Sequence, residues 1–589
     1  MWSSAGFFDW VGDCVPHPPS RRRSRGPRGP ASLGQGAPEG APWYRRLCVP
    51  VVLATSLAAS ASSAQPKFFP DDPIWVDDDR VFDASTAGEI EDTNGYDFVV
   101  NTFIHPGERR EVRAMNVNTV DEVPDSSWFT NRIGHRPMTI EEIVRGPDTL
   151  PTISLDGWVV SAGKSSGVQA GFRMTDPTGQ TYQIEFDPPS NPEMATGAEI
   201  IGTALYYAMG YHTVEVYLAE LDPAKVLIAP TAKVFDPLIG ERRAVTSLDL
   251  EKVYQRAARL PNGRFRVLAS RFAPGKPAGN FRYYGTRPDD PNDLWPHEHR
   301  RELRGARVFG AWLNHDDSRG VNSLDFITTE NGRTYIKHYM FDFGSIMGSG
   351  TVFAQRHRAG NEYILEWRPG WLTLATLGIY TRPWLHIAYP PVPASVGRFE
   401  GDDFAAAAWK PEYPNPAFRN MRADDAFWAA RIVSRFSDAA IRAVVEKGRY
   451  TDPRATAYIT DTLIKRRDKV LREWIVGVNP LENFALDAAG ELTCDNAAVE
   501  LGLAKAPESY RAVWHRFDNA THESRRIDET TAASTRVRAP SDLPTARGVY
   551  VRVDVAATGG AHPSWSVPVS VYFQRTENGW KLVGLERLP

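Results

Sequence analysis

The sequence predicts an α+β protein in three parts: an N-terminal arm, a bilobal body with a strand-rich and a helix-rich lobe, and a C-terminal β-rich domain. Short, turn-bounded β-rich segments fill residues 158–186. Apolar residues recur at helical spacing over 296–313 and 424–475. Alternating valines near the C-terminus indicate one buried strand face. The expected boundaries are 1–64 (disordered extension plus signal peptide), 65–150 (arm), 151–235 (strand-rich small lobe), 236–478 (helix-rich large lobe) and 479–589 (β-rich domain).

Composition excludes several classes of function. Hydrophobic residues make up 42% and charged residues 24% of the chain, which is typical of a globular protein. The formal net charge of −4 argues against nucleic-acid binding, which needs a basic surface. We expect no transmembrane helix, because no apolar run reaches 18 residues. Three cysteines cannot build a disulfide framework.

The N-terminus has the order of a secretory signal peptide. Arg45 and Arg46 precede an apolar stretch from Leu47 to Leu57, and small residues continue to Ala64. Cleavage near Ala64 would make this an exported, periplasmic or extracellular protein; a short buried helix is the alternative. Residues 1–44 are rich in Pro, Gly and Arg and are not expected to fold. An incorrectly assigned start codon explains them better than a twin-arginine export route.

The arm and the first strands come next. Residues 65–150 are acidic and loop-rich, and their aromatic stretch 125–129 either packs an arm onto the body or lines a groove. Strands are expected at 158–160, 171–174 and 182–186. Asp176-Pro177-Thr178-Gly179 predicts a hairpin between the last two.

A helix is predicted after these strands. Thr196 and Glu199 have the spacing of a capping box, and Gly210 ends the apolar periodicity. A further strand follows at Val214–Leu218. Residues 300–304 contain three arginines, which indicate a solvated helix face more simply than a phosphate site.

The second half contains strong local signals. The helix at 296–313 precedes two strands joined by Asn331-Gly332, which is the strongest short hairpin signal. Ser437 and Asp452 are expected to start helices within 424–475. Val549, Val551, Val553 and Val555 alternate, and 567–574 is expected to pair with 580–585.

One constellation indicates chemistry. His315, Asp317 and Asn322 form the pattern H-x-D-x-x-x-x-N, and the hairpin that follows leads to Asp342-Phe343-Gly344. This order resembles the catalytic core of the protein-kinase-like superfamily, and especially the atypical HipA-type and CotH-type kinases, of which it would be a divergent exported member of bacterial type. The resemblance covers roughly residues 155–475. The alternative is that His315 and Asp317 cap a helix end and that residues 342–344 are an ordinary turn.

The resemblance implies roles for these residues and a bilobal kinase-like fold. Asp317, with His315 in the same loop, would act at the attacking hydroxyl, while Asn322 and Asp342 would hold a metal ion that bridges the phosphates. The cofactors would be ATP or another nucleotide, with Mg²⁺ or Mn²⁺. The acceptor would be a hydroxyl of an unidentified protein or small molecule.

The small lobe follows the family order but departs in one detail. The hairpin from Gly163 to Gly171, the strand 182–186 and the helix with Glu199 come in the expected sequence. However, Glu185 stands where the phosphate-binding lysine is expected, and a carboxylate there would repel phosphates. Lys164, between Gly163 and Gly167, could reach the phosphates instead and pair with Glu199. The alternatives are a solvated Lys164 and a purely capping Glu199.

Two classes of function therefore stay open. The first is an exported kinase-like phosphotransferase. The second is a pseudokinase of the cell envelope, which binds a ligand or partner without turnover; Glu185 and the scarcity of ATP outside the cytoplasm favour it. A plain envelope scaffold is a third.

Overall fold

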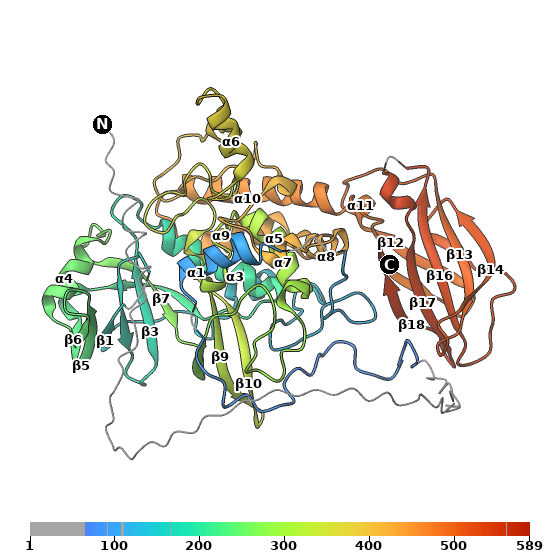
Figure 1. Cartoon of the computed structure of the whole chain (residues 1–589), viewed down its shortest axis with the longest axis horizontal. Helices are drawn as coiled ribbons and strands as arrows, with labels where there is room; N and C mark the ends of the chain where they lie inside the picture. Colours follow the sequence, from blue (N-terminus) through green and yellow to red (C-terminus); the bar gives the residue numbers. More distant parts are fainter. Residues whose placement is uncertain (1–64, 91, 108–110, 165–166, 561, 589) are drawn as a thin grey trace, which may run out of the picture. The chain divides into compact units, whose positions relative to one another are not determined.

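The computed structural model describes residues 65–90, 92–107, 111–164, 167–560 and 562–588. The predicted signal peptide and its cleavage site at Ala64 lie outside the described residues, so export stays a prediction. From residue 66 onward the chain is one compact unit of mixed helices and sheets, which confirms the α+β fold class (Figure 1). Among the described residues, no helix is long and apolar enough to cross a membrane.

The strand-rich lobe is built on a seven-stranded sheet with the order β4-β7-β3-β2-β1-β5-β6. All neighbouring strands are antiparallel except β1 and β5. The lobe extends beyond the predicted boundary at residue 235, because β6 and β7 pair within the same sheet. Its elements are β1 (Val159–Gly163), β2 (Gly171–Thr175), β3 (Thr181–Phe186), α3 (Met194–Met209), β4 (Val216–Leu221), β5 (Leu227–Asp236), β6 (Glu241–Ala244), α4 (Ser247–Gln255) and β7 (Phe265–Arg271).

Strand β3 shows how this sheet presents a charged group to one side. Tyr182, Ile184 and Phe186 alternate into the apolar core of the lobe, so Glu185 points to the other face of the sheet. The hairpin predicted between β2 and β3 is confirmed by their antiparallel pairing.

The predicted capping box at Thr196 is wrong. Helix α3 begins earlier, at Met194, after Glu193 in a left-handed conformation. The backbone N–H and the hydroxyl of Thr196 both donate to the Asp187 carboxylate, at 2.9 and 2.5 Å. Glu199 therefore lies within the helix and is available for another partner. Gly210 ends α3 as expected.

The helix-rich lobe contains the predicted hairpin and helices. β9 and β10 pair across Asn331-Gly332, both with positive φ, and β8 completes a three-stranded sheet. Ser437 and Asp452 cap their helices as predicted. The bounds are β8 (Lys276–Gly279), α5 (Arg301–Leu313), β9 (Ser323–Glu330), β10 (Arg333–Met340), α6 (Trp367–Ala375), α7 (Pro416–Arg419), α8 (Ala423–Ser434), α9 (Asp438–Lys447) and α10 (Pro453–Trp474).

The C-terminal part is β-rich, as the alternating valines predict. A five-stranded antiparallel sheet has the order β14-β13-β16-β17-β18, and Val551, Val553 and Val555 of β16 are fully buried. The second sheet is three-stranded, and residues of both sheets share one core with the helices. The elements are β11 (Leu481–Leu486), β12 (Glu491–Asn496), α11 (Ala497–Glu500), β13 (Ser509–Phe517), β14 (Ser524–Ala532), β15 (Arg536–Arg538), β16 (Tyr550–Thr558), β17 (Val569–Thr576) and β18 (Gly579–Glu586).

The arm, which contains α1 (Asn94–Val99), a π-helical turn (Val100–Ile104) and α2 (Ile140–Arg145), packs onto the body. Trp128 is buried and stacks on His338, with ring centroids 3.5 Å apart. This contact shows that the aromatic stretch at 125–129 is a packing element.

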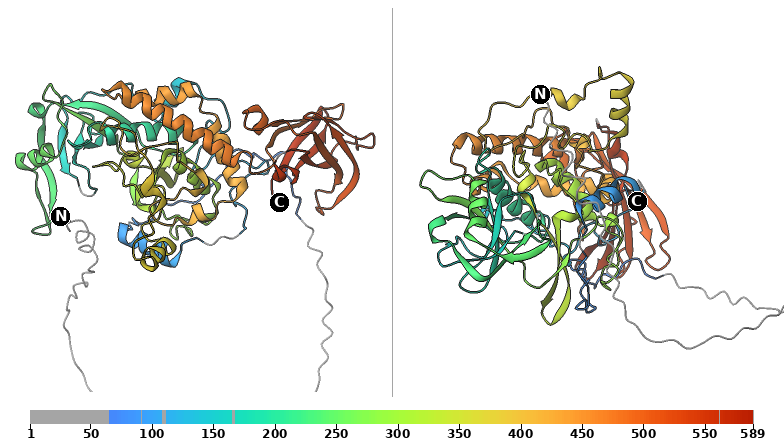
Figure 2. Two further views of the ribbon diagram at one scale, coloured as in Figure 1. Left: turned by 90° about the horizontal axis from the view of Figure 1, so that it is seen from above. Right: turned by 60° about the vertical axis from the view of Figure 1, so that its left-hand side comes forward.

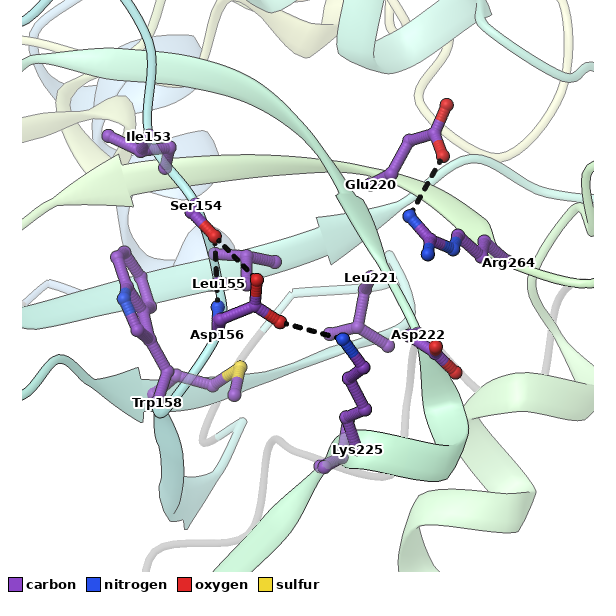
Figure 3. A pocket seen from close by; sticks show the side chains of 12 residues that line it. Ile153, Ser154, Leu155, Asp156, Trp158, Glu220, Leu221, Asp222, Lys225 and Arg264 are labelled. Atoms are coloured by element: carbon purple, nitrogen blue, oxygen red, sulfur yellow. Dashed lines mark hydrogen bonds and ion pairs between the residues drawn. The ribbon is translucent and has the colours of Figure 1, made fainter.

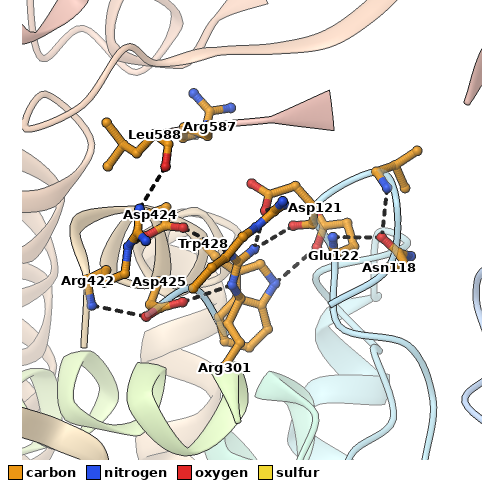
Figure 4. A network of polar contacts seen from close by, with 12 residues as sticks. Asn118, Asp121, Glu122, Arg301, Arg422, Asp424, Asp425, Trp428, Arg587 and Leu588 are labelled. Carbon is orange, nitrogen blue, oxygen red and sulfur yellow. Dashed lines mark hydrogen bonds and ion pairs between the residues drawn. The ribbon is translucent and has the colours of Figure 1, made fainter. Parts of the chain in front are cut away.

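Buried ion pairs join the arm, α5 and α8 (Figure 4). Arg301 contacts Asp121 at 2.8 Å, Asp424 at 3.2 Å and Asp425 at 3.0 Å. The expectation of a solvated arginine face is therefore wrong, because Arg300, Arg301 and Arg304 are all buried. The network extends to the C-terminus, where Arg422 donates to the carbonyl of Leu588.

We predict that Arg301→Met strongly destabilises the protein, because it leaves three buried carboxylates without their shared cation. Loss of one partner of a buried pair costs about 3–5 kcal/mol. The Tm should fall by several degrees. Arg454→Met removes an exposed ion pair with Asp452 and serves as the control, with an unchanged Tm. Equal Tm values for the two variants would contradict a stabilising role for the network.

Candidate active site

The loop between α5 and β9 carries the predicted catalytic residues. Helix α5 ends at Asn314, whose left-handed backbone turns the chain out of the helix. The Asn314 side chain is fixed by Trp409 Nε1, which donates to its Oδ1 at 3.0 Å, and by Gln355, which accepts from its Nδ2 at 2.8 Å. The loop then closes in a single turn at Gly320–Asn322, and β9 begins at Ser323.

Asp317 and Asn322 are held together in this loop. The Asn322 amide Nδ2 donates to the Asp317 backbone carbonyl at 2.9 Å, which turns the amide oxygen away from that contact. The Asp317 carboxylate forms an ion pair with Arg319 and accepts a hydrogen bond from Ser345 at 3.4 Å. Ser345 follows Asp342-Phe343-Gly344, so the two predicted motifs are in direct contact.

Asp342 lies where negative charges gather. The hairpin β9–β10 returns the chain to the loop, and Asp342 follows with φ 65° and ψ 59°. Burial, together with the nearby charges of Asp317 and Glu185, raises the pKa of Asp342 to about 7, although Lys164 and Arg319 act in the opposite direction. The structure therefore brings residues of both lobes to one site.

Glu199 of α3 contacts the same turn. Burial and the neighbouring charges of Asp342 and Glu185 hold the pKa of its carboxyl well above the usual value, although the nearby backbone N–H groups of Gly344 and Phe343 act in the opposite direction. The close approach depends on Gly202, where a Cβ atom would lie 2.5 Å from that of Phe343. This helix position has no room for a side chain.

His315 is packed between Tyr206 and Phe343. It is buried, its Nδ1 lies 2.9 Å from the Tyr206 hydroxyl, and its ring packs edge-on against Phe343. Burial lowers the pKa of His315 to about 4, so the imidazole is neutral at pH 7. Its Nε2 is buried without a hydrogen-bond partner among the described residues, and a part of His315 in the chemistry stays a prediction.

Lys164 does not pair with Glu199 as expected. Its Nζ forms an ion pair with Glu185 at 2.6 Å and donates to the Gln169 carbonyl at 3.1 Å. Lys164 thus neutralises the Glu185 carboxylate, which was expected to repel phosphates. The two charges still act on Asp342.

The two glycines beside Lys164 have different reasons to be glycine. Gly167 has a φ of +84°, and a Cβ there would lie 3.2 Å from the Lys164 Nζ. At Gly163 a Cβ would lie 2.5 Å from Val234 of β5, so this glycine permits strand packing. Of the two, Gly167 is the one that borders the charged end of Lys164.

The sequence analysis did not identify Arg319, nor the residues that hold Asp316 in place. Arg319 bridges Asp317 and Glu412, 3.2 Å from the latter. Gln355 donates to Asp316 at 2.7 Å, and burial beside Asp317 and Glu412 raises the pKa of Asp316 well above its usual value. Arg319 lies within the H-x-D-x-x-x-x-N motif and could have been noticed, but Gln355 and Glu412 are too distant in sequence to give a signal.

The described residues contain no group of three or more His, Cys, Asp or Glu side chains arranged to hold a metal ion by themselves. A cation at Asp342 and Asn322 would thus need further ligands, such as phosphate oxygens and water, as Mg²⁺ commonly has.

A hollow of about 300 Å³ lies elsewhere in the strand-rich lobe (Figure 3). Four of its charged residues are paired, Asp156 with Lys225 at 3.2 Å and Glu220 with Arg264 at 3.7 Å, and Asp222 accepts from the backbone N–H of Ala224 at 3.0 Å. It includes none of the predicted site residues.

Comparisons with known proteins give little further information. No protein-family profile matches the chain, and no curated protein sequence matches it. A search of solved structures finds the crystal structure of a Helicobacter pylori proinflammatory kinase, CtkA, at 12% identity. The match covers 54% of this chain and 95% of that one, with a TM-score of 0.27. A similarity this low carries no argument about the present site.

We predict that Asp342 makes the protein without bound metal less stable as the pH rises. A carboxyl whose folded-state pKa is about 7 instead of 3.8 binds protons more tightly in the folded state, so its unfavourable effect grows between about pH 4 and 7. Asp342→Asn should therefore raise the Tm at pH 7.5 in EDTA and leave it nearly unchanged at pH 4. Thermal scans across this pH range measure the difference. A lower Tm for the variant at pH 7.5 would show that the Asp342 charge is stabilised in the folded protein.

Proposed function

We propose that this protein transfers a phosphoryl group from a nucleotide to a hydroxyl group. The observation that carries the proposal is the contact between the two motifs, in which Ser345, next to Asp342-Phe343-Gly344, donates to the Asp317 carboxylate at 3.4 Å. Burial and the charges of Asp317 and Glu185 also raise the pKa of Asp342, to about 7. Groups with strongly perturbed pKa values are concentrated at functional sites. A site with surplus buried negative charge suits a divalent cation, which relieves the repulsion between neighbouring carboxylates.

Asp342 and Asn322 fit the role of metal-binding residues. Carboxylate and amide oxygens suit Mg²⁺ and Mn²⁺, and the Asn322 oxygen is on the side of its amide that does not contact Asp317. The cation, when bound with a nucleotide, would neutralise phosphate charge. Glu199 would then keep Asp342 in position through the backbone of Phe343 and Gly344.

Asp317 fits the role of the carboxylate that orients the acceptor hydroxyl and receives its proton. Arg319 and Ser345 hold this carboxylate from two sides. Lys164, on the β1–β2 hairpin, supplies the positive charge for the phosphates. The acceptor, a protein or small-molecule hydroxyl, and an exported location after cleavage near Ala64 are part of the same proposal.

Binding without turnover is the second candidate function. The observation that favours it is the ion pair of Lys164 with Glu185, since a lysine engaged at 2.6 Å has less charge to offer a phosphate. A pseudokinase would still bind a nucleotide or another ligand at the same residues.

We predict that ATP with Mg²⁺ or Mn²⁺ raises the Tm of the full chain, while ATP in EDTA does not. The chain should also release ADP or incorporate phosphate, and Asp342→Ala should reduce that rate by about 100-fold or more. Asp156→Ala, which removes an exposed carboxylate of the strand-rich lobe away from the candidate site, is the control and should behave as wild type. Metal-dependent stabilisation without phosphate transfer would favour the pseudokinase. No stabilisation by any nucleotide would contradict both.

We predict that the positively charged side chain of the Lys164–Glu185 pair can stand at either of the two positions. Lys164→Ala should weaken nucleotide binding by about tenfold or more, because it also leaves Glu185 unpaired. The double variant Lys164→Glu/Glu185→Lys keeps one charge of each sign and should recover most of the loss. Isothermal titration with ATP and Mg²⁺ gives both affinities. An affinity of Lys164→Ala equal to that of wild type would exclude this lysine from phosphate binding.

A further inference from the structure

Residues 367–387 form an exposed apolar projection between Gly344 and α7. It begins with α6, and no residue of this helix is buried. The helix stands clear of its neighbours in Figure 1 and in the right-hand view of Figure 2. Its large apolar side chains are exposed to an unusual degree, reaching 93% at Leu377 and 84% at Ile379. The others are Trp367, Trp371, Leu372, Leu374 and Leu385.

Polar contacts at its base hold the projection in place. Arg382 donates to the Glu362 carboxylate at 2.8 Å and to the Thr373 hydroxyl at 2.8 Å. The indole N–H of Trp384 donates to the same carboxylate at 2.7 Å. Glu362 is itself buried. The returning chain is therefore tied to the start of the projection, and the apolar residues between are presented to the outside.

The tip of the projection satisfies many of its own polar groups. The N–H groups of Leu377 and Gly378 donate to the carbonyls of Leu374 and Thr373, at 3.1 and 2.8 Å. The Thr376 hydroxyl donates to the Leu372 carbonyl at 2.7 Å and accepts from the Tyr380 N–H at 2.9 Å. Backbone with internal hydrogen bonds can leave water at low cost, which is the requirement for entry into lipid.

The charge of this segment is one-sided. The sequence has no Asp or Glu from Trp367 to Phe399, although the whole chain is acidic with a net charge of −4. Arg368 is exposed at the start of α6, beside Trp367. Arginine and tryptophan suit the headgroup level of a bilayer, whereas leucine and isoleucine suit the acyl region.

We propose that the apolar projection inserts into the interfacial layer of an anionic phospholipid bilayer. Leu374, Leu377 and Ile379 would enter the acyl boundary, and Trp367 and Arg368 would lie at the headgroups. A projecting tip whose backbone groups are hydrogen-bonded internally, with Arg368 exposed beside it, matches a lipid surface better than a protein groove. The interaction is independent of phosphoryl transfer, because it uses no residue of the candidate active site.

The test is co-sedimentation of the full chain with vesicles, without nucleotide. Vesicles of phosphatidylcholine with a quarter phosphatidylglycerol should bind the protein, and pure phosphatidylcholine should bind it more weakly. Leu374→Ser/Leu377→Ser/Ile379→Ser should lower the partition coefficient by about 100-fold or more. Arg368→Glu should lower binding to the anionic vesicles by about tenfold and leave binding to neutral vesicles less affected.

A matched control exists on another surface. Leu227, Leu238 and Ile239 belong to the β5–β6 hairpin, have the same residue types and are likewise exposed. Their triple serine variant should bind vesicles as the wild type does. Equal binding by both triple variants, or no binding of the wild type to anionic vesicles, would overturn the proposal. If the wild type is a dimer that does not bind vesicles, and the 374/377/379 variant alone is monomeric, the projection makes a protein contact instead.

Discussion

The candidate active site depends on the contact between α3 and the turn at Asp342–Gly344. The Glu199 carboxylate lies beside the backbone N–H groups of that turn, which act to lower its pKa, and Gly202 lets Phe343 approach the helix closely. Because α3 belongs to the strand-rich lobe and the turn to the helix-rich lobe, this contact sets how the charged residues of the two lobes meet. Tyr206, one turn beyond Gly202 along α3, stacks on Phe343 with centroids 4.4 Å apart and contacts His315, so the loop that carries Asp317 is fixed by the same helix.

This arrangement concentrates charge at some cost to stability. The carboxylates of Glu185, Glu199, Asp317 and Asp342 interact with one another, and Lys164 and Arg319 compensate them only in part. Packing alone gives no reason to bury such a surplus, since an unpaired buried charge is expensive. A divalent cation and a phosphate group would together give each of these residues a partner. The lysine–carboxylate pair runs between the hairpin and β3, and this leaves Glu199 free to hold the turn.

Local sequence signals predicted where helices and hairpins form, whereas contacts between residues distant in the sequence determine what individual polar side chains do. Asn331-Gly332, Ser437 and Asp452 each act within a few residues, and the structure has the hairpin and helix starts that they predict. Thr196 matched a capping box, but Asp187 from the preceding loop competes successfully for its hydroxyl. Arg301 has the pattern of a solvated face until its partners, 124 and 180 residues away, are known. The order of Asp317, Asn322 and Asp342 pointed to segments that the structure brings into contact, through the hydrogen bond from Ser345 to Asp317, and their roles stay a prediction. The ion pair of Lys164 depends on strand register, which the sequence left open.

Diffraction from crystals soaked with Mn²⁺ and a non-hydrolysable ATP analogue tests the central claim most directly, because the anomalous signal locates the cation without assumptions about the acceptor. We expect a Mn²⁺ peak within coordination distance of the Asp342 carboxylate and the Asn322 amide oxygen, with the analogue's phosphates near Lys164. A peak bound only at other carboxylates, with no cation or phosphate between α3 and the Asp317 loop, would contradict the proposed metal site.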